Sequence, residues 1–123
     1  MDELCYEIVK KKCFPDVDLI KLKNIETKKL LSIKKERTFS EYCWTITPIT
    51  PKIVFDRNPN AKRVTYLDAD LWFRKSPKRI FEEFEKSKKE VLITEHAYDP
   101  EYDQSEKYGK YCVQFMIFKK GGE

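Results

Sequence analysis

The stretch "RVTYLDADLWF", Arg63 to Phe73, decides the fold, because it joins a strand pattern to two acids one residue apart. Its first part is rich in β-branched and aromatic residues, which favour a buried strand. Residues i and i+2 of a strand project to the same side. We therefore expect Asp68 and Asp70 to point together at the carboxyl end of this strand, where open α/β sheets bind their ligands.

A helix and two further strands are predicted after the acids. Ser76 is a hydroxyl N-cap, and Pro77 suits the first turn of a helix. The predicted elements are a helix over residues 78–89, a buried strand over 90–96, a polar, tyrosine-rich loop or lid over 97–110, and a last strand over 111–118.

The part of the chain before the acids is predicted to be mostly helical. The predicted elements are a helix over residues 2–12, a short strand over Val17–Leu22, a helix over 25–36, and two helical pieces that Pro48 and Pro51 break between Trp44 and Ile53. Strands that alternate with helices predict an α/β protein with a mainly parallel sheet, right-handed crossovers and helices on both faces. We expect one domain over residues 1–123.

Composition narrows the class of protein. The chain has 123 residues, 41% of them hydrophobic and 37% charged, which suits one globular domain with an ionised surface. Its net charge of +4 comes without a dense basic stripe, so we expect no nucleic-acid partner. No apolar run approaches the roughly 20 residues of a membrane span, and no segment resembles a signal peptide. We expect a cytoplasmic protein, in solution or at the inner membrane surface.

The cysteines do not suggest a metal site or disulfides. Four cysteines without CxxC spacing and one histidine argue against a zinc site. We interpret Cys5, Cys13 and Cys112 as small buried hydrophobic residues.

Two neighbouring carboxylates suggest a cation. Like charges so close are unfavourable unless a cation joins them. Two carboxylates and water suit Mg²⁺ or Mn²⁺, which share their ligand shell with substrate phosphates. In the alternative interpretation, Asp68 and Asp70 only cap or solvate a turn. The hydrophobic residues on both sides of the acids favour the metal site.

Four segments resemble one enzyme family. "VTYLDADLWFRKSPKRIFEEF" resembles the D-x-D region of nucleotide-sugar glycosyltransferases of the GT-A fold, and most of all the bacterial nucleotide-diphospho-sugar transferase type encoded with surface polysaccharide genes. The segments "KKERTFSEYCWTITP", "KEVLITEHAYDPE" and "GKYCVQFMIFKK" are similar to their neighbours in that family. The resemblance covers about Met1 to Lys120. Compared with the family, the chain looks like a central portion that is incomplete at both ends.

The resemblance implies transfer of a sugar from a nucleotide-diphosphate donor, most simply a UDP-sugar, to a sugar, glycan or lipid-linked acceptor in surface polysaccharide synthesis. Asp68 would lie near the ribose and the metal, and Asp70 would bind the divalent ion that bridges the diphosphate. A bound Mn²⁺ or Mg²⁺ would stabilise the diphosphate leaving group as a Lewis acid.

Three further residues are candidates for the site. His96 follows a predicted strand at the same sheet edge as Asp68, so it is a candidate general base; the alternative is a loop histidine paired with a neighbour. Gln114 would contact the donor sugar, or its amide would be satisfied by the backbone. Arg37 would approach a phosphate, or it would be an exposed arginine at a helix start.

The aromatic residues offer two interpretations. Those at helical and strand spacings are interpreted as core rather than as a sugar-stacking set: Trp44, Trp72, Phe73, Phe81 and Phe84. Those in the predicted loop would stack on a sugar if the loop closes as a lid, or would simply anchor it: Tyr98, Tyr102 and Tyr108.

Two other functions remain open. A phosphohydrolase of the HAD type also has D-x-D after a buried strand, but there a Thr or Val stands where this chain has Trp72, and the motif lies near the start of the chain. A non-catalytic fragment that packs on a partner would expose an apolar sheet edge and form oligomers. The nucleotide, the sugar, the acceptor, the stereochemistry and the oligomeric state stay open.

Overall fold

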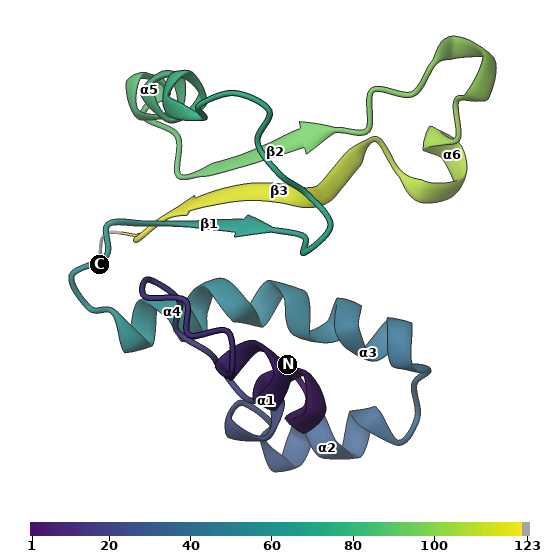
Figure 1. Ribbon diagram of the computed structural model, residues 1–123. Helices are drawn as coiled ribbons and strands as arrows, with labels where there is room; N and C mark the ends of the chain where they lie inside the picture. The colour runs from purple at the N-terminus through teal and green to yellow at the C-terminus, as the bar shows by residue number, and fades with distance from the viewer. Residues whose placement is uncertain (122–123) are drawn as a thin grey trace. The chain divides into compact units, whose positions relative to one another are not determined.

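The chain divides into two compact units. The computed structural model describes residues 1–121; the first unit is Met1–Thr47, and the second begins at Pro48 (Figure 1). The expectation of one domain stays a prediction. None of the helices among residues 1–121 is long and apolar enough to cross a membrane.

The first unit is helical. Its helices are α1 (Glu3–Lys10), α2 (Lys28–Lys34) and α3 (Phe39–Ile46), with a short 3-10 turn at Leu22–Asn24. Their positions match the predicted helices. Leu30, Tyr42 and Ile46 are its buried hydrophobic residues.

Side-chain caps explain where these helices begin. The carboxylate of Asp2 accepts a hydrogen bond from the amide of Cys5, and the hydroxyl of Thr27 accepts one from the amide of Leu30. Thr38 and Glu41 form a reciprocal capping box at the start of α3. Each cap satisfies an amide that has no partner inside its helix.

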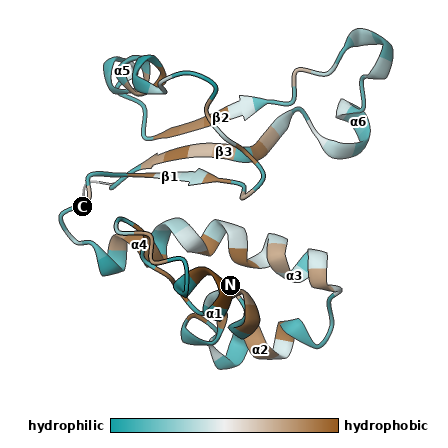
Figure 2. Cartoon of the chain, in the orientation of Figure 1, coloured by the Kyte–Doolittle hydropathy of each residue, from teal (hydrophilic) through white to brown (hydrophobic). Residues whose placement is uncertain are grey.

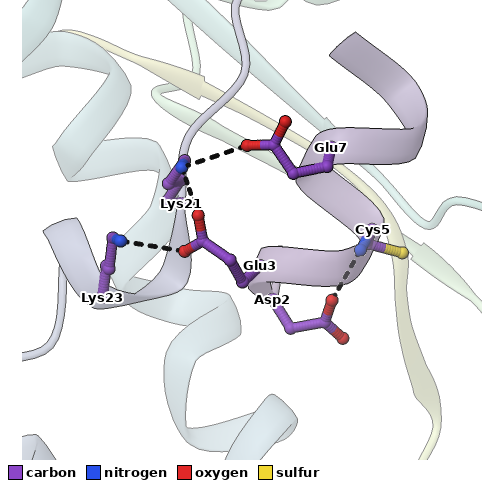
Figure 3. A network of polar contacts seen from close by, with 6 residues as sticks. All are labelled: Asp2, Glu3, Cys5, Glu7, Lys21 and Lys23. Carbon is purple, nitrogen blue, oxygen red and sulfur yellow. Dashed lines mark hydrogen bonds and ion pairs between the residues drawn. The ribbon is translucent and has the colours of Figure 1, made fainter. Parts of the chain in front are cut away.

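The predicted strand over residues 17–22 does not form. Its main chain bonds to the N-terminus instead: the Met1 amino group donates to the carbonyl of Ile20 at 3.0 Å, and the Leu22 amide donates to the carbonyl of Met1 at 2.7 Å. Figure 3 shows the ion pairs that tie this segment to α1. Lys21 pairs with Glu3 and Glu7, and Lys23 pairs with Glu3 at 2.9 Å. A strand needs a neighbouring strand, and this helical unit supplies none among its described residues.

The second unit is a three-stranded sheet with helices. The strands are β1 (Arg63–Leu67), β2 (Val91–Glu95) and β3 (Tyr111–Lys119), in the spatial order β1-β3-β2. The helices are α4 (Thr50–Arg57), α5 (Lys78–Ser87) and α6 (Ser105–Tyr108), with 3-10 turns at Thr47–Ile49 and Pro100–Tyr102.

The prediction of a mainly parallel sheet of the GT-A type is wrong. Both β1 and β2 pair with β3 in the antiparallel sense. The helix α5 does connect two strands that run in the same direction, as expected, but these strands do not pair because β3 lies between them (Figure 1). The connection from β2 to β3, residues 96–110, is long enough for a crossover, but the two strands that it joins run in opposite directions.

The helix α5 is held against one face of the sheet by charge pairs and by cations over its aromatic rings. Arg63 lies over the ring of Phe81, and Lys119 lies over the ring of Phe84. The carboxylate of Glu85 lies 3.0 Å from Arg63 Nη1 and 3.0 Å from Lys119 Nζ, two residues that face each other across β1 and β3. Ile117, two residues from Lys119 and therefore on the same face, is fully buried. The other buried hydrophobic residues described in this unit, apart from Pro51 in α4, are Phe84, Cys112 and Met116.

Several burial predictions are corrected. Cys112 is buried as expected, but Cys5 and Cys13 are exposed. Trp44 and Trp72, both interpreted as core, are 69% and 80% exposed. In Figure 2, which colours each residue by its hydropathy, hydrophobic and hydrophilic residues are interspersed along the helices and strands. Residue type predicted burial, but both tryptophans lie on surfaces that their unit leaves open.

Candidate functional site

The two aspartates lie in a turn at the carboxyl end of β1. The amide of Leu71 donates to the carbonyl of Asp68 at 3.1 Å, which closes a four-residue turn from Asp68 to Leu71. Asp70 is therefore in a turn and not in the strand, so the alternation of a strand does not set its direction. Asp68 is half-buried, and Asp70 is exposed.

Asp68 is fixed by two neighbours. Its carboxylate Oδ1 accepts a hydrogen bond from the hydroxyl of Tyr66 at 2.6 Å, and its amide donates to the carbonyl of Gln114 at 2.9 Å. The second bond continues the register of β1 and β3 by one residue. The structure thus brings together Asp68 and Gln114, two residues that the sequence singled out.

The pairing of β3 changes beside this turn. Ile93 pairs with Met116, but the next residue, Thr94, pairs with Cys112, so residues 113–115 bulge from the ladder with β2. Bulges often lie next to functional sites because they redirect side chains. Gln114, in the middle of this bulge, is exposed.

The loop after the aspartates is anchored at both ends and open in between. The ring of Phe73 meets the ring of Phe115 edge-on, with centroids 5.9 Å apart. Asp68 anchors the other end of the loop through Gln114. Trp72 lies between these anchors and is 80% exposed. The sequence interpretation missed Trp72 because it treated the residue type as core; its place in a loop directly after two acids was the available signal.

His96 lies past the end of β2. Its amide donates to the carbonyl of Lys110 at 3.0 Å, and its ring stacks on that of Tyr98 with centroids 4.8 Å apart. Asp68 and His96 both follow strands that run in the same direction. Asp68 lies beside Gln114 of the central strand, whereas His96 lies beside Lys110, just before that strand begins. The ring of His96 therefore packs on a residue of its own loop, and its role as a general base stays a prediction.

Arg37 belongs to the other compact unit. Its guanidinium donates to the hydroxyl of Thr45, on the helix α3 that begins just after it. Arg37 is exposed, and a contact with a phosphate stays a prediction. Of the predicted donor-binding residues, Asp68, Asp70 and Gln114 lie in the second unit, whereas Arg37 does not.

The carboxylate oxygens of Asp68 and Asp70 are some of the ligands that a hard divalent cation needs. Within residues 1–121 no group of three or more His, Cys, Asp or Glu side chains is arranged to hold a metal. The Asp70 carboxylate makes no hydrogen bond or ion pair with any described residue, and Asp68 uses only Oδ1. Mg²⁺ and Mn²⁺ are often bound by one or two carboxylates, with water and substrate phosphates completing the shell. Asp68 and Asp70 supply two such carboxylates, and metal binding at the turn stays a prediction.

Comparison with known proteins gives two relatives. An uncharacterized protein of Bacillus subtilis (strain 168), YfnF, is 40% identical over 82 residues, which is 67% of this chain and 27% of the relative. A second from the same strain, YfnD, is 31% identical over 102 residues, 83% of this chain and 32% of the relative. The chain therefore spans less than a third of the length of the curated relatives it matches. No family model matches the chain, and no solved structure matches it.

Proposed function

We propose that the chain is part of a glycosyltransferase and that its Asp68–Asp70 turn binds the diphosphate of a nucleotide sugar through Mn²⁺ or Mg²⁺. The observation that carries the proposal is this turn at the end of β1, with one carboxylate fixed by Tyr66 and the other exposed. The resemblance of the surrounding sequence to nucleotide-sugar transferases supports the same chemistry. A divalent cation bound there would stabilise the charge of the diphosphate leaving group.

The neighbouring side chains suit the rest of such a donor. Gln114 is exposed beside Asp68 and offers both a donor and an acceptor to sugar hydroxyls. The exposed ring of Trp72 offers a flat apolar surface to a nucleobase or a sugar. His96 stays a candidate general base, with its ring held by Tyr98.

The proposal extends to location and acceptor. A donor of this kind is used in the cytoplasm, in solution or at the inner membrane surface, and the acceptor would be a sugar, a glycan or a lipid-linked sugar of surface polysaccharide synthesis.

Nucleotide binding with and without metal is the direct test. UDP, GDP, CDP, ADP and dTDP are titrated in the presence of Mn²⁺ and again with EDTA, and free Mn²⁺ is followed by electron paramagnetic resonance. We expect Mn²⁺ to tighten the binding of one nucleotide relative to its binding in EDTA, and Asp70→Asn to abolish that metal-dependent gain. Asp16→Asn, which removes an exposed acid of the other unit, is the matched control and should bind normally.

The same experiment can contradict the proposal. Equal nucleotide binding by Asp70→Asn and by the wild type in the presence of Mn²⁺ would exclude a role for the turn. Release of inorganic phosphate from a phosphomonoester, lost in Asp68→Asn, would instead indicate a phosphohydrolase.

A non-catalytic packing role is the second candidate. β2 is an edge strand, and Val91 and Ile93 on it are 53% and 39% exposed. Exposed apolar edge strands favour association with another chain. Sedimentation velocity of the wild type and of Ile93→Lys measures this directly: a stable oligomer that the substitution dissociates, without nucleotide binding, would favour the packing role.

A further inference from the structure

Positive side chains gather at the end of β1 that lies opposite the aspartates. Two open hollows of about 750 and 820 Å³ flank the turn of residues 59–61, between α4 and β1. The basic residues that line them, which we call the basic notch, are Arg57, Lys62, Arg63, Lys119 and Lys120. All of them belong to the second unit.

The charge of the notch is unbalanced. Against these five cations, Glu85 is the one acid that lines either hollow within the described residues. The excess of four positive charges equals the net charge of the whole chain, +4. The second unit as a whole has 15 Lys and Arg against 13 Asp and Glu, a net charge of +2, so the notch is more positive than the unit that contains it.

Some of these cations are held in position and others are free. Glu85 bridges Arg63 and Lys119, and Lys120 Nζ donates to the carbonyl of Pro59 at 2.7 Å. By contrast, Arg57 and Lys62 are exposed and make no side-chain hydrogen bond or ion pair within residues 1–121. Arg57 lines the first hollow and Lys62 the second, so each hollow combines a cation with no such side-chain partner within residues 1–121 and at least one that is held by other residues.

We propose that the basic notch binds the phosphate groups of a phosphorylated ligand without a metal. Arginine presents a planar fork of donors that matches phosphate oxygens, and lysine adds a compact charge. Asn60, which lines both hollows, offers an amide donor. From Arg63 to Asp68 the extended chain covers roughly 17 Å, so this site is distinct from the one proposed at the aspartates.

Pyrophosphate titrated in EDTA, followed by calorimetry, tests the site. The wild type should bind pyrophosphate without metal, and Arg57→Gln/Lys62→Gln should weaken binding about tenfold or more, because two charge-assisted hydrogen bonds are lost. Lys11→Gln/Lys12→Gln removes the same charge from exposed residues of the other unit and should bind normally. Asp70→Asn should also bind normally, which separates this site from the proposed donor site.

The variants are chosen so that a folding defect cannot imitate the result. Arg57→Lys/Lys62→Arg keeps both charges and should restore most of the affinity. Two further ligands identify the source of the phosphate: glycerol 1-phosphate represents a soluble ester, and vesicles containing phosphatidic acid represent a lipid. A ligand that competes with pyrophosphate in the wild type but not in Arg57→Gln/Lys62→Gln supports the site and identifies the source of the phosphate.

Three results would overturn the proposal. These are the absence of pyrophosphate binding in EDTA, an equal loss of affinity in Arg57→Gln/Lys62→Gln and in Lys11→Gln/Lys12→Gln, and displacement of pyrophosphate by a short single-stranded RNA at concentrations well below those of pyrophosphate. The last result would assign the notch to nucleic acid.

Discussion

The hydroxyl of Tyr66 donates a 2.6 Å hydrogen bond to Oδ1 of Asp68, two residues further along the same face of β1. This bond fixes the orientation of the carboxylate. Its second oxygen, Oδ2, makes no hydrogen bond among the described residues and is free to accept one. Partners of this kind determine how well a carboxylate binds a metal, because they hold its geometry before the metal arrives.

Tyr66→Phe should therefore weaken Mn²⁺ binding at the Asp68–Asp70 turn. Removal of a residue that orients a metal ligand costs roughly 10- to 100-fold in affinity. Electron paramagnetic resonance of free Mn²⁺ in the presence of the preferred nucleotide measures the change. Tyr102→Phe is the control, because that side chain is 71% exposed. Unchanged Mn²⁺ affinity in Tyr66→Phe would show that the hydrogen bond does not serve the metal.

Trp72→Ala should weaken nucleotide-sugar binding by roughly two- to tenfold, the loss expected when one stacking contact is removed. Trp72→Phe should retain most of the affinity, since a smaller ring still stacks. Calorimetry is the suitable measurement because it does not need the indole as a reporter. Trp44→Phe, in the other compact unit, is the control, and a loss of equal size in that variant would contradict a stacking role for Trp72.

Tyr42→Phe should destabilise the protein by about 1.5–3 kcal/mol, the usual contribution of a hydrogen bond to a charged group. The hydroxyl of Tyr42, a residue only 3% exposed, donates to Glu26 Oε1 at 2.9 Å, and Lys34 pairs with the same oxygen at 2.7 Å. Urea unfolding, followed by circular dichroism, gives the free energy. Tyr6→Phe is the control, because Tyr6 is a half-buried tyrosine of the same unit whose hydroxyl makes no hydrogen bond among the described residues, and an equal loss there would contradict the assignment.

The stability difference between wild type and Tyr42→Phe should narrow at alkaline pH. Burial, and then the hydrogen bond to Glu26, raise the pKa of Tyr42 from 10 to about 12. The folded state thus holds this proton more tightly, so its contribution is complete below pH 10 and disappears between pH 10 and about 12. Urea unfolding of both proteins from pH 9 to 12 measures the difference, because lysine titration affects both alike. A constant difference across that range would contradict the raised pKa.

Glu85→Gln should increase the affinity of the basic notch for pyrophosphate by roughly two- to fivefold, because it releases Arg63 and Lys119 from an exposed ion pair. The two cations lower the pKa of Glu85, chiefly through the hydrogen bond from Lys119, so the carboxylate competes with a bound anion at neutral pH. Calorimetry in EDTA measures the gain, and Glu83→Gln on the same helix, outside the notch, is the control. Weaker binding by Glu85→Gln would mean that Glu85 positions the cations rather than competing.

Much of the secondary structure was predictable because local chemistry determines it. The capping box of Thr38 and Glu41 marks the start of α3, and the β-branched residues before Asp68 mark β1. Strand order was not predictable in this way. The hydrophobic patterns of β2 and β3 suit either direction of pairing, and the choice depends on contacts between residues far apart in the chain.

The sequence indicated which residues are candidates for the site, but it did not predict how these residues are arranged. Asp68 and Gln114 are neighbours because β3 runs antiparallel to β1, an arrangement that the predicted parallel sheet did not contain. The expectation that Asp70 follows strand alternation fails because the strand ends at Leu67 and a turn begins. Trp72 shows the limit of residue type as a guide: an indole is usually buried, but a loop anchored on both sides of it leaves this one exposed.

The central position of β3 also constrains how the protein can fold as it is synthesised. Its two neighbours, β1 and β2, emerge from the ribosome first and have no strand to pair with until residues 111–119 follow. The sheet cannot grow strand by strand from the N-terminus and must close in one late step that joins distant segments. A nascent chain that pauses before Tyr111 would therefore expose both strands to chaperones or to other unfolded chains.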